Sequence, residues 1–451
     1  MTAKKRTIWN FYEGIEGDKV VWMIVLMLIM FSILCIFSST SRLLGPGETR
    51  LDIVWGHIKI VLFGLVLILA CYAIPSIEFF RKCSSLGFGV SVALLVLLLL
   101  RINLGFIRAA EINGAWRIIK VGSLQLHVYE VVKIAMVLYL SWAIDAFKKK
   151  ELKLFADKPL YQKAFYIYAP FLLITVMVLP GSNSAALFTG GIMFLTILLG
   201  GGSGKDMFVL VLAGVALLAI CIGLYKVSDG KVMGRIGTGL SRVLDKEDYE
   251  AQVMHARPHS VEFFQALDEI RQPYSAKIAI HQGGFLGKGP GGSTQRYVVP
   301  DISEDYMYSF IIEEYGILGG IVIIILYLSL LARSAIIVRN CGKDLFAKLS
   351  VAGLTLLITG QAFLHICVNV DIGPMTGQTL PLISHGASAF LCFCIAFGII
   401  LSISKIASKR IAREQMNADP LVDRHIENSD IRNDLNALDS FESGNDMDYG
   451  V

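Results

Sequence analysis

Charged residues are scarce in this sequence. Of its 451 residues only 17% are charged and 55% are hydrophobic, and the mean hydropathy is +0.62. This composition excludes an ordinary soluble domain and is typical of a polytopic membrane protein. Phosphate-binding loops are also missing, because Gly200–Lys205 and Gly287–Lys288 both lack the first glycine of that motif. We therefore expect no nucleotide site and no nucleic-acid partner.

Cysteines are few, and none of the eight lies in a predicted outer loop. We expect no external disulfide as a result. Cys392 and Cys394 share an apolar helix with no further ligands nearby, so we predict no metal site there. A cleavable signal is not expected either, because the first apolar run lacks a small-residue cleavage site and indicates a retained helix.

Long apolar runs are what the sequence has in abundance. They fall at 20–38, 57–74, 86–100, 128–144, 166–180, 185–200, 207–225, 306–332, 349–370 and 382–403. Because a membrane-spanning helix needs about 20 such residues, we predict an all-α polytopic membrane protein of about ten transmembrane helices. A large extracytoplasmic loop at about 227–305 separates the seventh helix from the eighth.

Basic residues orient these helices. In a ten-helix arrangement most of them fall on one side, which places both termini in the cytoplasm: Lys4, Lys5, Arg6, Lys148, Lys149, Lys150, Lys153, Lys158, Lys163, Arg333, Arg339, Lys343, Lys348, Lys405, Lys409 and Arg410. The exceptions lie in the loop after the third helix and indicate an anionic ligand on the outer side: Arg101, Arg108, Arg117 and Lys120. We divide the chain into a cytoplasmic N-terminus (1–19), a transmembrane domain (20–405) and an acidic, disordered cytoplasmic tail (406–451).

One carboxylate stands out. Asp305 lies where a polar loop rich in glycine (Gly287, Gly289, Gly291 and Gly292) runs back into apolar sequence. A carboxylate at a membrane boundary needs a partner or a role, so an acid acting on a head group at that boundary is one interpretation. The other is that Asp305 only caps the helix that begins near Tyr306.

Two further patterns indicate polar features within the membrane. Glu130 and Lys133 are three residues apart in the fourth helix and share a face. They are either a buried pair that holds helices together or the polar floor of a substrate cavity. Proline and glycine are dense at 369–388, which indicates non-helical backbone lining a cavity rather than a plain helical hairpin.

Three motif blocks in these regions resemble the SEDS family, the FtsW and RodA peptidoglycan glycosyltransferases, along most of the chain. The blocks are Asn113-Gly114-Ala115-Trp116-Arg117, the stretch from Gly283 to Gly316, and Thr376-Gly377-Gln378-Thr379-Leu380-Pro381-Leu382-Ile383-Ser384-His385-Gly386-Ala387-Ser388. The sequence departs from the family at His127-Val128-Tyr129, Pro180-Gly181-Ser182-Asn183, His385 and Ala387. Thr379 favours the FtsW branch over the RodA branch.

The resemblance implies an enzyme that extends glycan strands from lipid II, an undecaprenyl-diphosphate-linked substrate, at the outer face of the bacterial cytoplasmic membrane. The family's catalytic aspartate corresponds to Asp305, which would be the base for an attacking sugar hydroxyl. The expected substrate-binding residues are Arg117, Glu130, Lys133, Asn113, Lys288, Thr376 and Ser384. Arg117, Lys133 or a divalent cation (Mg²⁺ or Mn²⁺) would stabilise the diphosphate; no other cofactor is expected.

The resemblance also implies a class B penicillin-binding protein transpeptidase as partner, within a division or elongation complex. Helices eight and nine and the loop at 227–305 would provide the contact. Two other functions stay open. One is a lipid flippase or exporter, which Glu130, Lys133 and the proline and glycine breaks would suit; the other is a non-catalytic division scaffold.

Overall fold

The computed structural model describes residues 16–39, 49–103, 105–112, 115–122, 124–228, 237, 246–257, 260–299, 302–373 and 375–418. The N-terminal residues 1–15 and the acidic tail from 419 onward lie outside these ranges, so the predicted character of both segments stays a prediction.

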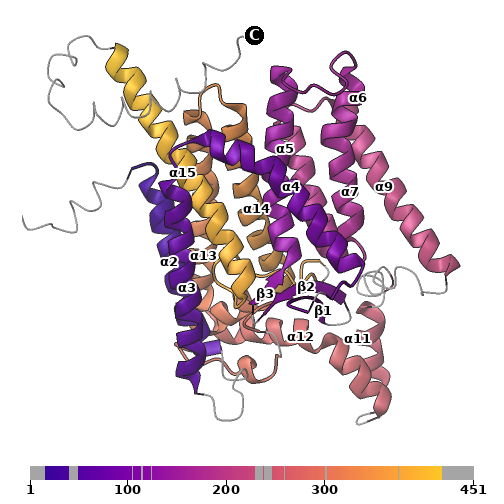
Figure 1. Cartoon of the computed structure of the whole chain (residues 1–451). Helices are drawn as coiled ribbons and strands as arrows, with labels where there is room; N and C mark the ends of the chain where they lie inside the picture. The colour runs from indigo at the N-terminus through magenta and orange to yellow at the C-terminus, as the bar shows by residue number, and fades with distance from the viewer. Residues whose placement is uncertain are drawn as a thin grey trace, which may run out of the picture.

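Helices dominate the described chain (Figure 1). In chain order they are α2 (Lys19–Ser39), α3 (Arg50–Ala73), α4 (Ile77–Leu99), α5 (Val128–Lys149), α6 (Pro159–Lys163), the π-helical turn η2 (Ala164–Tyr168), α7 (Ala169–Val178), α8 (Asn183–Leu199), α9 (Gly204–Val227), α11 (Lys246–His255), α12 (Val261–Gly283), the 3₁₀ turn η3 (Gln295–Tyr297), α13 (Met307–Asn340), α14 (Leu345–Asn369) and α15 (Ala387–Ala418).

Eight spans within the described ranges are long and apolar enough to cross a membrane, with Pro159–Val178 counted as one. The shorter apolar helix α8 and the 22-residue α5, which carries more charge, complete the ten helices that the sequence predicts. The prediction of a polytopic ten-helix protein is therefore confirmed. The apolar runs located the spans well because length and hydropathy alone decide which segments lipid accepts.

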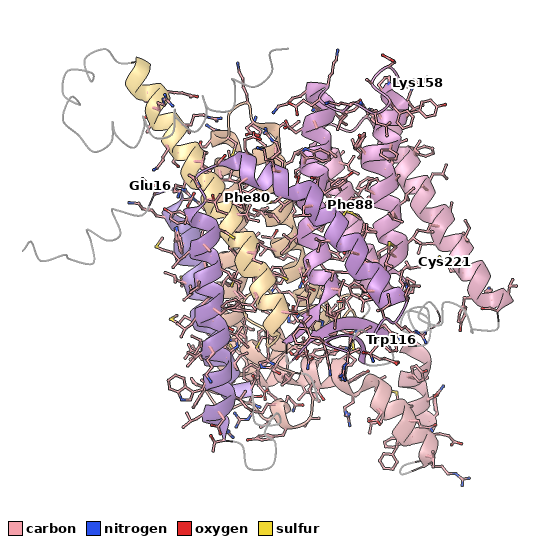
Figure 2. All side chains as sticks on the ribbon, in the orientation of Figure 1. Glu16, Phe80, Phe88, Trp116, Lys158 and Cys221 are labelled. Carbon is pink, nitrogen blue, oxygen red and sulfur yellow. The ribbon has the colours of Figure 1, made fainter. Side chains whose placement is uncertain are left out.

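The core has two lobes. One cluster of buried side chains joins α2, α3, α13, α14 and α15, and the other joins α4, α5, α7 and α8. Aromatic contacts reinforce the second lobe: Phe88 of α4, labelled in Figure 2, stacks on Tyr139 of α5 with ring centroids 4.5 Å apart. Helix α5 also packs against α14 of the first lobe, so the two lobes meet along these two helices.

A small sheet between α4 and α5 was not predicted. Its strands β1 (Ile107–Ile112), β2 (Ala115–Val121) and β3 (Leu124–His127) pair antiparallel in the order β1-β2-β3. The backbone amide of His127 donates to Ser388 Oγ at the start of α15 (3.0 Å), which ties the sheet to the bundle. The sheet and α12 lie at one end of the bundle, here called the site end (Figure 1), and α12 packs against α13, which begins two residues after Asp305.

Both ends of the described chain meet at the opposite end. Glu16 and Lys409 form an ion pair of 3.1 Å, and Asp18 pairs with Arg333 at 2.8 Å. The backbone amide of Asp18 also donates to Ser404 Oγ. The two ends therefore lie on the same side, as an even number of crossings requires. That this side faces the cytoplasm stays a prediction.

Helix α13 is interrupted at Gly316, whose φ of 72° and ψ of −177° are far from helical values. The loop after α12 fills the break. The amides of Lys288 and Gly289 donate to the carbonyls of Glu313 and Glu314, both at 2.9 Å. In return, the amide of Ile317 donates to the Gly284 carbonyl at 3.0 Å. A Cβ at Gly316 would lie 2.2 Å from the Phe285 carbonyl oxygen, so only glycine fits this crossing.

Candidate functional site

Asp305 is half-buried at the site end, directly before α13. The N-cap position of α13 is occupied by Tyr306, which makes no side-chain cap hydrogen bond, so Asp305 lies one residue outside the cap. Its carboxylate faces Gly377, where an added Cβ would lie 3.5 Å from Asp305 Oδ2. The acid of the glycine-rich loop and the proline- and glycine-rich segment after α14 therefore come together, although the sequence separates them widely.

The segment 375–386 is non-helical, as predicted, and polar contacts hold it in place. Ser384 Oγ accepts from the Leu380 amide (2.9 Å) and donates to the Glu304 carbonyl (2.8 Å). The His385 amide donates to the Ser303 carbonyl at 2.8 Å. Tyr327 OH of α13 donates to the Pro381 carbonyl at 2.6 Å. The segment is thus held by the two residues before Asp305 and by Tyr327 of α13, and the hydroxyl of Ser384 is used in these contacts.

Lys133 is the centre of what we call the lysine cluster: Glu130, Lys133, Gln361 and Gln378. Its ammonium group donates to Glu130 Oε1 and Gln361 Oε1 at 2.8 Å and to Gln378 Oε1 at 2.9 Å. It also lies 5.3 Å from the ring centroid of Phe188. The side chain is 2% exposed. A buried ammonium with three acceptors is fully satisfied, so this geometry favours a structural floor over direct contact with a substrate.

A polar stripe on α14 continues the network, and the sequence reasoning did not identify it. Gln361, His365 and Asn369 are four residues apart and are buried. His365 hydrogen-bonds the Gln378 carbonyl through Nδ1 (2.7 Å) and the Tyr308 amide through Nε2 (3.3 Å). Asn369 donates from Nδ2 to the Asp305 carbonyl (3.0 Å) and accepts from the Ser309 amide (2.9 Å). The spacing of four along an otherwise apolar helix was the available signal.

Glu313 and Glu314 form a second group, the glutamate cluster, with Lys288, Ser293 and Thr294. Glu313 accepts from Lys288 Nζ (2.6 Å), Ser293 Oγ (2.5 Å) and the Thr294 amide (2.8 Å). Glu314 accepts from the Gly291 amide at 3.1 Å and from Ser38 Oγ of α2. Both carboxylates are at most 1% exposed. Lys288 is thereby engaged in shaping the glycine-rich loop, and the predicted contact of Lys288 with substrate stays untested.

Arg117 and Thr376 lie on two further sides of the site. Arg117 of β2 is half-buried, and its Nε donates to the Gly181 carbonyl at 3.3 Å, which brings the sheet to the loop between α7 and α8. The Thr376 carbonyl accepts from Ser184 Oγ at 2.9 Å. Asn113 lies outside the described residues, so its predicted role has no structural test.

Metal ligands do not gather at this site. Among the described residues no group of three or more histidine, cysteine, aspartate or glutamate side chains could hold a metal ion. Mg²⁺ is often bound by one or two carboxylates together with substrate phosphates. A cation at Asp305 would therefore depend on the substrate for its remaining ligands.

Comparisons with known proteins agree on one family. The family model FTSW_RODA_SPOVE, described as "Cell cycle protein", matches residues 18–409. The probable peptidoglycan glycosyltransferase FtsW of Coxiella burnetii is 27% identical over 77% of this chain and 85% of its own. The corresponding protein of Lactococcus lactis is 26% identical over 87% of this chain and 93% of its own.

Solved structures share the fold. A chain described under "Structural coordination of polymerization and crosslinking by a peptidoglycan synthase complex" superposes with a TM-score of 0.61 at 19% identity, covering 87% of this chain and 98% of the solved one. The rod shape determining protein RodA of Thermus thermophilus gives a TM-score of 0.55 at 18% identity, covering 87% and 98%. At this identity the likeness concerns the fold alone.

Proposed function

The chain belongs to the FtsW/RodA/SpoVE family of cell cycle proteins, and on that premise we propose that it is a peptidoglycan glycosyltransferase that polymerises lipid II. The observation that carries the proposal is the meeting of Asp305 with the segment around Gly377 at the site end of a multi-pass membrane protein. The relatives that align with most of this chain are named probable peptidoglycan glycosyltransferase FtsW, which supports the proposal.

Asp305 would act as the general base. An acceptor sugar hydroxyl attacks the anomeric carbon of the donor, the carboxylate takes the hydroxyl proton, and the bond to the lipid diphosphate breaks. A diphosphate leaves without prior protonation, so one carboxylate suffices where glycoside hydrolysis uses two. The Asn369 amide holds the backbone carbonyl of Asp305 and so restricts where the carboxylate can lie.

Arg117 would stabilise the leaving diphosphate. It is the more accessible of the two cations considered, because Lys133 is 2% exposed and already has three acceptors. This assignment separates their roles: Arg117 contacts the substrate, while Lys133 with Glu130 supports the floor beneath it. The satisfied lysine cluster also counts against a transporter, since a proton or ion relay needs groups whose partners change.

The site end would face the outside of the bacterial cytoplasmic membrane, with both termini in the cytoplasm, because most basic loops lie at the opposite end. The partner would be a single-pass class B penicillin-binding protein that crosslinks the new glycan. Exposed apolar side chains of α13 support that contact: Ile317, Leu318, Ile321, Val322, Ile325 and Leu328. The loop at 227–305 would add to it outside the membrane.

The decisive experiment is polymerisation of fluorescent lipid II by the purified full-length chain, alone and with a candidate transpeptidase. Asp305→Ala and Asp305→Asn should lower the rate by about a thousandfold or more, because the base is lost from the transition state. The matched control is Glu262→Gln, an exposed acid at the start of α12. A folded Asp305→Ala protein that polymerises at the wild-type rate would remove Asp305 from the mechanism.

A further inference from the structure

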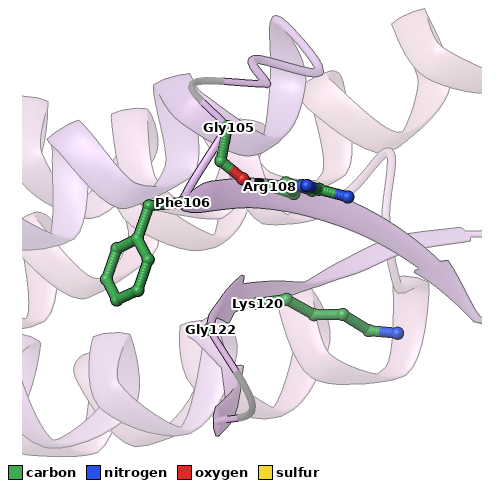
Figure 3. Close-up of a pocket in the computed structure, with 5 residues that line it drawn as sticks. All are labelled: Gly105, Phe106, Arg108, Lys120 and Gly122. Carbon is green, nitrogen blue, oxygen red and sulfur yellow. Dashed lines mark hydrogen bonds between the residues drawn. The ribbon is translucent and has the colours of Figure 1, made fainter.

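A basic cavity lies in the sheet, apart from the candidate site. Gly105, Phe106, Arg108, Lys120 and Gly122 line a space of about 300 Å³ where β1 begins and β2 ends (Figure 3). The Phe106 ring packs closely against Gly122, where an added Cβ would lie 3.2 Å from the ring. The cavity contains none of the residues assigned above to catalysis or substrate binding.

The two cations of this cavity oppose each other. Arg108 and Lys120 are direct partners in the antiparallel register of β1 and β2. Both side chains are exposed and extend to the same side of the ribbon in Figure 3. Like charges in this arrangement destabilise a strand pair. In the described part of the chain no acidic side chain forms an ion pair with either cation. An anion between them would turn this repulsion into attraction.

The guanidinium group is held in place for such a ligand. Arg108 Nε donates to the Gly105 carbonyl at 2.7 Å, and Gly105 has a φ of 74° that glycine adopts without strain. This bond uses one donor of Arg108 and leaves the outer nitrogens available for a planar, bidentate contact. Phosphate oxygens match that geometry.

The cavity lies close to the end of a membrane span. Helix α4, which is long and apolar enough to cross the membrane, ends at Leu99, shortly before Gly105. Phe106, which lines the cavity, is 70% exposed, and Leu100 at the end of α4 is 66% exposed. Cations beside exposed apolar side chains at the end of a span are typical of the head-group region of a bilayer. A freely soluble anion would use the cations but not these apolar neighbours.

We propose that this cavity binds the phosphate head group of an anionic phospholipid from the surrounding leaflet. Arg108 and Lys120 hold the phosphate, while Phe106 contacts the glycerol backbone and the first carbons of the acyl chains. The ligand would cancel the repulsion between the strands and fix the sheet at the membrane surface. This inference does not depend on the proposed enzymatic function.

The test is native mass spectrometry of the full-length protein released from detergent with equimolar phosphatidylglycerol and phosphatidylcholine of identical acyl chains. The wild type should retain phosphatidylglycerol preferentially. Arg108→Gln together with Lys120→Gln should reduce that preference by about fivefold for each cation removed, since a cation at an anionic membrane surface contributes about 1 kcal/mol. The charge-matched control is Lys153→Gln with Lys205→Gln, two exposed lysines at the opposite end, the first in a loop and the second in the first turn of α9.

A second variant separates lipid binding from folding. Lys120→Glu places an acid opposite Arg108, so the strand pair should become no less stable while the lipid preference is lost. The proposal is overturned if the wild type shows no preference, or if Lys120→Glu keeps both its Tm and the full preference. Displacement of the phospholipid by millimolar inorganic phosphate would likewise overturn the assignment to a lipid.

Discussion

The lysine cluster and the glutamate cluster both bury charge, but their partners come from different distances along the chain. Lys133 takes its acceptors from residues 130, 361 and 378, on α5, α14 and the segment after α14. Glu313 takes its donors from Lys288, Ser293 and Thr294, all within one loop that precedes its helix. The lysine cluster therefore joins the two lobes of the bundle, whereas the Glu313 half of the glutamate cluster shapes one loop. Substitutions in the lysine cluster should therefore destabilise the whole bundle, whereas loss of Glu313 should destabilise one loop.

Lys133→Met should have the largest effect on stability. It leaves Glu130, Gln361 and Gln378 without their shared donor, and removing one partner of a buried ion pair typically costs about 3–5 kcal/mol. We expect a large fall in Tm and loss of polymerisation, measured by thermal unfolding in detergent and the lipid II assay. Adding Glu130→Gln should recover part of the Tm.

The matched control is Lys163→Met. Its ion pair with Asp206 is of similar length (2.9 Å, against 2.8 Å for Lys133 with Glu130), but the lysine side chain is 30% exposed. Such a pair contributes about 1 kcal/mol or less. Equal losses of Tm in the two variants would mean that burial of Lys133 does not matter.

Glu313→Gln should have an intermediate and local effect. The charge-assisted bonds to Lys288 and Ser293 weaken, and hydrogen bonds to a charged group contribute about 1.5–3 kcal/mol. The amides of Thr294 and Gln295, which donate to the Glu313 carboxylate, should exchange hydrogen about ten- to a hundredfold faster, while those of α5 keep their protection. If exchange accelerates across the whole bundle instead, the glutamate cluster is not local.

Asn369→Ala should mainly affect turnover. The side chain holds the Asp305 carbonyl and the Ser309 amide, so its loss lets the carboxylate drift without opening the core. We expect kcat to fall about tenfold, equivalent to about 1.4 kcal/mol, with KM little changed and Tm lowered by less than in Lys133→Met, because a neutral donor and acceptor are lost rather than a buried charge. Cys367→Ala on the same helix is the control, and a parallel loss of Tm and kcat would indicate a purely structural residue.

Arg117→Ala should have the smallest effect on the stability of the fold and should selectively weaken binding of lipid II. The side chain is half-buried, and its Nε donates to the Gly181 carbonyl at 3.3 Å, in the loop between α7 and α8. KM for lipid II should rise several-fold while Tm stays close to wild type. Arg50→Ala, at the exposed start of α3, is the control. Unchanged affinity and turnover in Arg117→Ala would rule out its contact with the diphosphate.

The sequence predicts the spans and the break around Gly377 because both follow from local composition: apolar length in one case, and proline and glycine density in the other. It also brings out Asp305, Glu130 and Lys133 as isolated charges. It could not predict that Lys133 meets Gln361 and Gln378, since contacts between distant segments depend on how the helices pack. The strands β1–β3 were missed because the stability of short strands depends mainly on their pairing with neighbouring strands, which the local sequence does not show. Gly316 was noticed as part of a motif but not as a helix break.

The exchange of backbone bonds at Gly316 has a mechanical consequence. The loop at 284–289 is hydrogen-bonded through its own peptide groups to α13 on both sides of the break at Gly316. The loop therefore cannot move relative to α13 without losing these backbone hydrogen bonds. Helix α12, which leads directly into that loop, and the first turns of α13 therefore move as one rigid unit. Asp305 lies two residues before α13 begins, so it is attached to this unit. A partner that binds the surface of α12 and shifts this helix would therefore also shift the Asp305 carboxylate, without entering the site.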